Sequence, residues 1–201
     1  MSPGLTTERI YAVLKAQIME GERQAGERLD PARLAAELNA SATPVRDALH
    51  QLLGERMVQA RPGHGFQVPL PCETTMCELY TWNADLLGLL LRGWSPEKKP
   101  PLPVSQYRHD RASMVATLFD TIASTLGNAE HGQAVRQAND RLHRARKAET
   151  TMFKDLANEL DNLVAAWADG RATDLRSAIS RYHRRRVRNV AQIVARIALG
   201  P

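Results

Sequence analysis

Apolar residues recur every three or four positions in the first third of the chain, which is the period of an α-helix. The first such series extends over about 7–20 and ends at Gly21, and the second extends over 31–38 after Asp30. The third begins after Ser41, and its apolar stripe consists of Val45, Ala48, Leu49, Leu52 and Leu53. Aspartate and serine are favoured caps for helix N-termini, so Asp30 and Ser41 are expected to cap the second and third helices.

The polar face of the third helix carries candidate binding chemistry. Thr43, Arg46, Asp47 and His50 lie away from the apolar stripe, and Thr43 and Arg46 are close to the leading end of the helix. A hydroxyl and a guanidinium at a helix N-terminus, with the positive end of the helix dipole behind them, suit phosphate oxygens and base edges. The pattern therefore favours a helix that enters the major groove of DNA end-first.

Two short strand-like runs follow, at 57–61 and 65–68, joined through Pro62, Gly63 and His64. Glycine lets a loop approach DNA closely because it has no Cβ atom, so His64 and Gly65 are expected to contact a phosphate or the minor groove. The alternative is a simple hairpin turn with an exposed histidine. Three helices and a β-hairpin predict a winged helix-turn-helix.

This order of residues resembles the N-terminal domain of GntR-type bacterial transcription regulators over roughly residues 5–70. The matching segments include Gly26-Glu27-Arg28-Leu29, Thr43-Pro44-Val45-Arg46-Asp47-Ala48-Leu49 and Gly65-Phe66-Gln67-Val68. The resemblance implies contacts to a double-stranded DNA operator from Arg33, Ser41, Thr43, Arg46, His64 and Gly65. The family usually has an arginine where this chain has Ala42, so the resemblance also implies a different operator.

The net charge of +5 does not by itself identify this part of the chain as a DNA-binding domain. Residues 1–70 carry eight Lys/Arg and eight Asp/Glu, so the basic excess lies beyond residue 70. Any positive surface that meets DNA must therefore be local. We expect it to consist of Arg33, Arg46, Arg61 and His64 on one face.

The rest of the chain has a helical period throughout. After the linker Pro69-Leu70-Pro71, helices are expected at about 73–93, 111–126, 130–147, 150–168 and 173–198. The predicted fold is mostly α, with a winged helix-turn-helix DNA-binding domain at 1–70 and an all-α helical bundle at 71–201. The aromatic side chains of the bundle are expected to lie mainly in its core.

A helical bundle behind a GntR-like winged helix resembles the FCD branch of the family, whose C-terminal domain dimerises and holds a small-molecule effector. The resemblance implies a homodimer and an effector site in 71–201, for which Asn83, Phe119 and His183 are the candidate residues. Asn83 lies near the position where the family tends to place an arginine that clamps a carboxylate. The effector itself is not identified by the sequence.

Members of that branch often bind a metal through an acidic residue and a histidine four apart, together with two later histidines. Val115 and Phe119 occupy the positions of the first pair here, so no metal and no other cofactor are expected. One imidazole cannot hold a transition metal alone. An alternative register would combine Asn139, His143, Asp161 and His183 in a residual metal site.

The last expected helix is rich in arginine, with Arg181, Arg184, Arg185, Arg186 and Arg188 close together. At about 100° per residue these side chains are expected to wrap around the helix. A solvated face is the default interpretation for them and for His143 and His183, which lie among arginines. Salt bridges, a dimer contact or an anionic-ligand site are the alternatives.

Several functional classes are disfavoured by the same sequence. It contains no serine elbow, no phosphate loop and no paired carboxylates in a glycine-bounded cleft, so an enzyme is not expected. Cys72 and Cys77 lack further cysteine or histidine ligands nearby and are expected to be reduced thiols. No apolar run approaches the roughly 18 residues that span a membrane, so a cytoplasmic protein is predicted. A winged helix used only for protein contacts is the alternative to a DNA-binding regulator.

Overall fold

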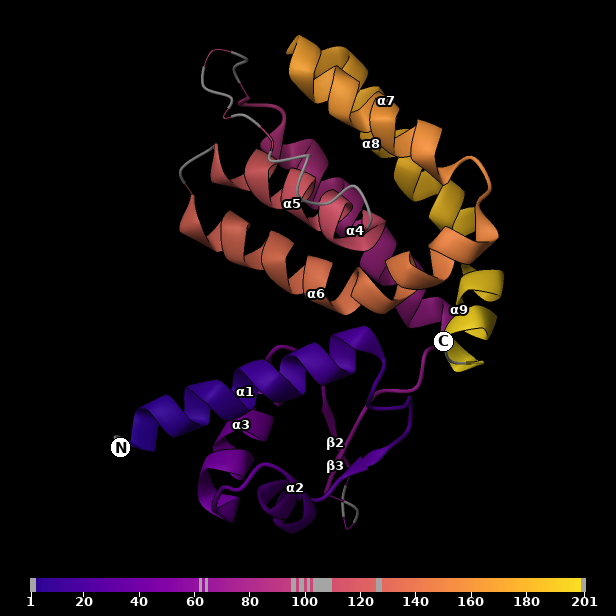
Figure 1. Cartoon of the computed structure of the whole chain (residues 1–201). Coiled ribbons are helices and arrows are strands. Elements are labelled where there is room, and N and C mark those ends of the chain that lie inside the picture. The colour runs from indigo at the N-terminus through magenta and orange to yellow at the C-terminus, as the bar shows by residue number, and fades with distance from the viewer. Residues whose placement is uncertain are drawn as a thin grey trace. The chain divides into compact units, whose positions relative to one another are not determined.

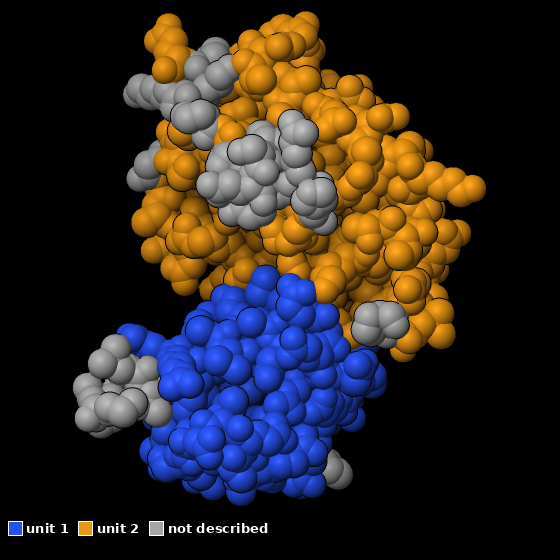
Figure 2. Space-filling model, viewed as in Figure 1, with its two compact units in different colours: residues 1–71, 200–201 blue, residues 72–199 orange. Residues whose placement is uncertain are grey.

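The computed structural model describes residues 3–61, 63, 65–94, 97, 100, 102, 110–125 and 128–199, and for residues 3–6 the backbone alone. The described chain divides into two compact units, residues 3–71 and residues 72–199 (Figure 2). The first combines helices with a small antiparallel sheet, and the second is made of helices, as Figure 1 shows. The predicted fold class is confirmed.

Three helices form the core of the first unit: α1 (Pro3–Glu20), α2 (Pro31–Glu37) and α3 (Ala42–Gly54). Asp30 caps α2 as predicted, because its side chain accepts hydrogen bonds of 3.0 Å from the backbone N–H groups of Ala32 and Arg33. The predicted apolar stripes meet in one core that includes Ile10, Leu14, Ile18, Leu34, Val45, Ala48, Leu49 and Leu52. Helix α1 packs mainly on α3 and thereby fixes the buried face of α3.

The sheet of the first unit has the order β1-β3-β2, with β1 at Arg28–Leu29, β2 at Gln59–Arg61 and β3 at Gly65–Gln67. Both pairings are antiparallel, and Phe66 of the central strand lies opposite Leu29 and Ala60. The hairpin β2–β3 is the predicted wing. Strand β1 was not predicted from the sequence, since two residues are too few to display an alternating pattern.

The second unit is a bundle of α4 (Glu73–Leu90), α5 (Arg111–Ser124), α6 (Ala129–Met152), α7 (Leu156–Asp169), α8 (Ala172–Arg188) and α9 (Val190–Ala198). Its core contains most of the aromatic side chains, as expected: Trp94, Phe119, Phe153, Trp167, Tyr80 and Tyr182. Among the described aromatic side chains of this unit, Trp82 is the exception, with 52% of its surface exposed on α4. Within the described residues, none of the helices has the length and apolarity to cross a membrane.

Two helix boundaries of the bundle differ from the sequence-based prediction. The expected break before Thr150 is absent, because α6 continues to Met152 and ends where Phe153 adopts an extended conformation. The hydroxyls of Thr150 and Thr151 accordingly donate back to the carbonyl oxygens of Lys147 and Ala148 instead of capping a new helix. The expected helix 173–198 is divided at Asn189 into α8 and α9.

Candidate nucleic-acid interface and buried polar site

Helix α3 has one buried and one exposed face, as an end-on reader of DNA requires. Val45, Ala48 and Leu49 are fully buried against the rest of the first unit. The exposed stripe, as we name it, consists of Thr43, Arg46, Asp47 and His50, which follow the i, i+3, i+4, i+7 spacing of one helix face and are all exposed. The structure therefore brings the predicted Thr43 and Arg46 onto one solvent-facing surface.

Ser41 occupies the N-cap position of α3 with an extended backbone, at φ −88° and ψ 160°. Its side chain makes no capping hydrogen bond, so the expected capping role is wrong even though the position is right. Ser41 is exposed and directly precedes the residues that carry the first N–H groups of α3. These groups remain available to an anion such as a phosphate.

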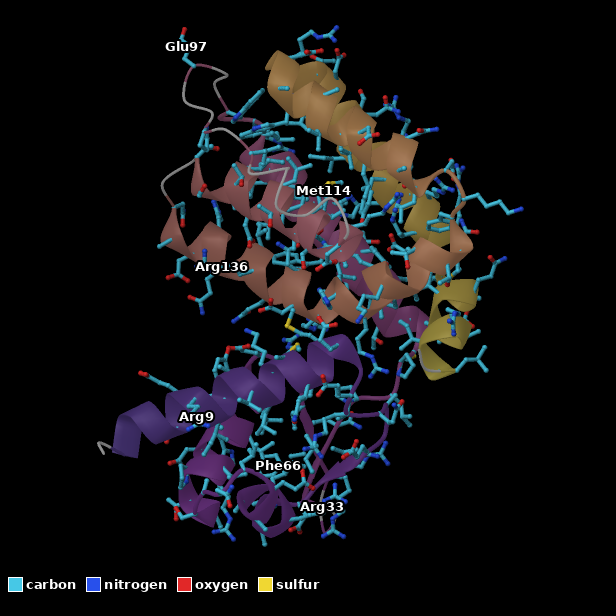
Figure 3. The ribbon with its side chains drawn as sticks, in the orientation of Figure 1. Arg9, Arg33, Phe66, Glu97, Met114 and Arg136 are labelled. Carbon is cyan, nitrogen blue, oxygen red and sulfur yellow. The ribbon has the colours of Figure 1, made fainter. Side chains whose placement is uncertain are left out.

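Arg33 projects from α2 with 53% of its side chain exposed (Figure 3). It is held by Glu27 at 3.2 Å, by Glu37 at 3.5 Å and by the carbonyl oxygen of Arg28 at 3.1 Å. Exposed ion pairs contribute at most about 1 kcal/mol, so a DNA phosphate can compete for this guanidinium. Arg46 differs from Arg33, because no ion pair or hydrogen bond of its side chain occurs among the described residues.

The wing keeps its glycines in backbone conformations that other residues rarely adopt. Gly63 has φ +74° and Gly65 has φ +72°, and open space surrounds the position of a Cβ atom at each. Arg61 opposite Gly65 in the hairpin is exposed. His64, the predicted contact at the tip, lies outside the described residues.

A contact that the sequence analysis missed connects α3 to the wing. The ring of His50 meets the ring of Phe66 edge-on, with centroids 5.0 Å apart and an interplanar angle of 84°. Phe66 also lies in the central strand of the sheet. The only sequence signal for this pair was the position of His50 on the exposed stripe, since sixteen residues of chain separate the two rings.

A second group of candidate residues comes together in the helical unit. Asn83, Phe119 and His183 are all buried, although they come from α4, α5 and α8. The rings of Phe119 and His183 are stacked, with centroids 5.6 Å apart. The Nε2 atom of His183 lies 2.9 Å from the side-chain amide of Asn83. The sequence analysis thus selected three residues that form one buried polar site.

The hydrogen bonds of His183 define its protonation state. Burial lowers the pKa of His183 to about 3, so the ring is neutral at ordinary pH. Its Nδ1 atom donates to the carbonyl oxygen of Ile179 at 2.8 Å, because that oxygen can only accept, and its Nε2 atom lies 2.9 Å from Oδ1 of Asn83. A neutral ring has no second N–H to donate, so Nε2 can accept from Asn83 only with the amide turned to present its NH2 group. As placed in the structure, the Nδ2 atom of Asn83 has no hydrogen-bond partner among the described residues.

Arg146 of α6 adds a charge to this buried site. Its side chain is buried, and its guanidinium lies 5.4 Å from the centroid of the Phe119 ring. Nη2 donates to the side-chain oxygen of Asn139 at 2.8 Å, and Asn139 in turn donates to Asp120 at 2.8 Å. Within the described part of the chain, Nε and Nη1 of Arg146 have no acceptor. Arg146 was not among the candidate residues predicted from the sequence.

The alternative metal register is not assembled in the structure. Asn139 and His143 share a face of α6 and are buried, as is His183, but Asp161 is exposed on α7. Among the described residues, no group of three or more histidine, cysteine, aspartate or glutamate side chains is placed to hold a metal. The default interpretation of His143 and His183 as solvated is wrong, since both are buried.

Arg186 is the second buried arginine, and it is fully paired. It donates to Glu149 from Nε and Nη2 at 3.0 and 2.8 Å, and to Glu159 from Nη1 at 2.7 Å. Burial raises the pKa of the Tyr80 hydroxyl well above its ordinary value, and this hydroxyl donates to Glu149 at 2.6 Å. The expectation that the arginine run is a solvated face is therefore wrong for Arg186.

Three helices, a three-stranded antiparallel sheet with a wing, and an exposed polar stripe on the third helix define a winged helix-turn-helix DNA-binding protein. Residues 6–68 match the family model described as bacterial regulatory proteins, gntR family. Residues 6–68 therefore form a GntR-family domain, the DNA-binding domain of that family of transcription regulators. No curated protein sequence gave a significant match to the chain.

Solved structures are similar to this chain over both units. A protein from Rhodococcus sp. RHA1, described as a GntR transcriptional regulator, is 17% identical over 92% of this chain and 97% of its own, with a TM-score of 0.80. E. coli McbR/YncC is 18% identical over 96% of this chain and 98% of its own, with a TM-score of 0.70. Lar of Listeria monocytogenes, which controls expression of the agr system, is 14% identical over 95% of both chains, with a TM-score of 0.52. The all-α fold expected for residues 71–201 is confirmed.

Proposed function

We propose that this protein is a homodimeric, cytoplasmic transcription regulator in which α3 of each protomer reads one half-site of a DNA operator. The observation that carries this proposal is the exposed stripe on α3, with Thr43 and Arg46 facing solvent and Arg46 without an ion-pair partner among the described residues. Ser41, Arg33 and the wing residues His64 and Gly65 are proposed to contact the DNA backbone or minor groove. A dimer with two-fold symmetry would bind two operator half-sites that lie about one helical turn of DNA apart.

Selection of duplexes from a random pool by the full chain tests this function. We expect recovery of a palindromic sequence whose affinity falls steeply with salt, because arginine contacts release counterions from phosphate. Failure to enrich any sequence would contradict operator recognition and would favour the alternative, a winged helix that binds another protein.

The proposed dimer is supported by apolar side chains that are exposed on α4. Trp82 and Leu89 are 52% and 48% exposed, and their spacing of seven residues puts them on one face of the helix. A second copy that covers this face in a two-fold contact would remove both side chains from water.

Leu89→Glu is expected to convert the dimer into a monomer, because the two-fold axis would place two like charges in one buried contact. Light scattering at micromolar concentration measures the change. Leu199→Glu is the matched control, since Leu199 is 79% exposed and lies outside α4. A dimer that survives Leu89→Glu, or a wild-type monomer, would contradict the assignment of this face.

The proposed effector site is the buried group Asn83, Phe119 and His183 together with Arg146. A buried guanidinium is costly when, as for Arg146 within the described residues, it forms no ion pair, and an anion that accepts from Nε and Nη1 would offset that cost. The proposed effector is therefore a small anion. The neutral His183 and the Phe119 ring would pack against the apolar part of such a molecule.

Arg146→Met is expected to leave the unliganded protein as stable as wild type or more stable, since it removes an uncompensated buried charge. The same variant should lose any rise in melting temperature that acetate or benzoate produces in wild type, relative to chloride at equal ionic strength. Tryptophan fluorescence measures this melting. A strongly destabilised Arg146→Met protein, or one that still responds to these carboxylates, would contradict the anion role of Arg146.

A further inference from the structure

A groove with a volume of about 630 Å³ lies between α7 and α8, apart from the buried polar site. It is lined by Asp155, Asn158, Glu159 and Asn162 on the α7 side and by Ala178, Arg181, Arg184, Arg185, Arg188 and Asn189 on the α8 side. The volume is within the range of small-molecule sites. Four of the ten lining residues are arginines and two are carboxylates, so the lining is basic.

Four of the arginines in the run thus share one face of α8. Arg181, Arg184, Arg185 and Arg188 have the i, i+3, i+4, i+7 spacing, so the expectation that the run wraps around the helix is wrong for these four. Arg181, Arg184 and Arg188 are exposed, and in the part of the chain that the structure describes none of the three has an ion pair. Like charges at these spacings destabilise a helix by a few tenths of a kcal/mol per pair, so the cluster does not serve helix stability.

The carboxylates of the groove are already engaged by other arginines. Asp155 accepts two hydrogen bonds from Arg185, one of them at 3.1 Å from Nη1. Glu159 accepts from Arg186 at 2.7 Å, beneath the groove. The guanidinium of Arg185 also lies 4.2 Å from the centroid of the Phe153 ring, which holds it in place. Arg181, Arg184 and Arg188 are left to give the groove a positive potential.

We propose that this groove binds a small anion with two or more linked phosphate groups. Guanidinium groups donate in pairs to phosphate oxygens, and the exposed amides of Asn158 and Asn162 supply further donors from the opposite wall. Arg181 and Arg188 are about 10 Å apart along the helix axis, a span that several linked phosphates fill and a single phosphate does not.

The composition of the lining disfavours an acidic peptide. Among the described residues, Ala178 is the one apolar side chain that lines the groove, so the groove offers no pocket for the aromatic or aliphatic anchors that dominate peptide binding. The absence of an aromatic ring from the lining also means that a nucleobase would gain no stacking there. Recognition is therefore directed at the phosphate chain.

Isothermal titration of the full chain with inorganic tripolyphosphate, at fixed ionic strength, tests the proposal. Wild type is expected to bind, and Arg181→Gln/Arg184→Gln is expected to bind at least about tenfold more weakly, because two charge-assisted donors are lost. Arg92→Gln/Arg136→Gln is the matched control: it removes two exposed arginines, from the C-terminal side of α4 and from α6, that do not line the groove (Figure 3). The control should bind as wild type does.

Each other outcome would overturn the proposal. Absence of binding by wild type, or an equal loss in the control variant, would leave only a diffuse positive surface. Orthophosphate binding as tight as that of tripolyphosphate would assign the groove to a single phosphate. Hexaglutamate binding of equal strength would assign it to an acidic peptide, and loss of operator binding in Arg181→Gln/Arg184→Gln would assign it to DNA.

Discussion

Replacement of Arg46 by alanine is expected to weaken operator binding by about 10- to 100-fold per half-site, because an arginine that meets a base edge contributes about 1–3 kcal/mol. Arg46 is exposed on α3 and has no ion pair within the described residues, so its loss should change the stability of the fold by less than about 0.5 kcal/mol. Fluorescence anisotropy with the selected duplex measures the affinity. Circular dichroism shows whether the fold is kept.

The salt dependence separates two roles for Arg46. If it contacts a phosphate, the slope of log affinity against log salt should fall by about one per contact, whereas a base contact changes selectivity at one position of the operator. Arg9→Ala is the matched control, since Arg9 is an exposed arginine of α1, whose opposite face packs on α3 (Figure 3). Wild-type affinity in Arg46→Ala would contradict a reading role for the exposed stripe.

The first unit could be predicted largely from sequence because its signals are local. The apolar stripe of α3 and the cap at Asp30 depend on residues within one or two helical turns, and both are present in the structure. The absence of a capping hydrogen bond at Ser41 could not be predicted in the same way. Residue type gives the preference for an N-cap, but the rotamer that satisfies it depends on the surroundings.

The buried charges of the helical unit left no local signal. Arginine is almost always exposed, so the run around Arg186 suggested a solvated face. The partners that bury Arg186 are Glu149 and Glu159, which are 37 and 27 residues away in the chain. Asn83 and His183, which are 100 residues apart, were selected through a family resemblance and not through their spacing.

Replacement of Arg186 by methionine is expected to destabilise the helical unit by about 3–5 kcal/mol, because it leaves the buried carboxylate of Glu149 without its counter-ion. The same guanidinium lies 3.4 Å from the centroid of the Tyr182 ring and donates to Glu159, so three helices lose a contact at once. Urea unfolding followed by tryptophan fluorescence isolates this effect. All three tryptophans of the chain, Trp82, Trp94 and Trp167, lie in the second unit.

A double-mutant cycle and a neighbouring residue supply the controls for Arg186. Glu149→Gln keeps an acceptor for the Tyr80 hydroxyl but removes the charge, so Arg186→Met/Glu149→Gln should recover part of the lost stability. Arg185→Met removes an ion pair whose Asp155 partner is 63% exposed, and the expected loss is below about 1 kcal/mol. Equal effects of Arg185→Met and Arg186→Met would mean that burial of the Glu149 charge does not determine the stability of this unit.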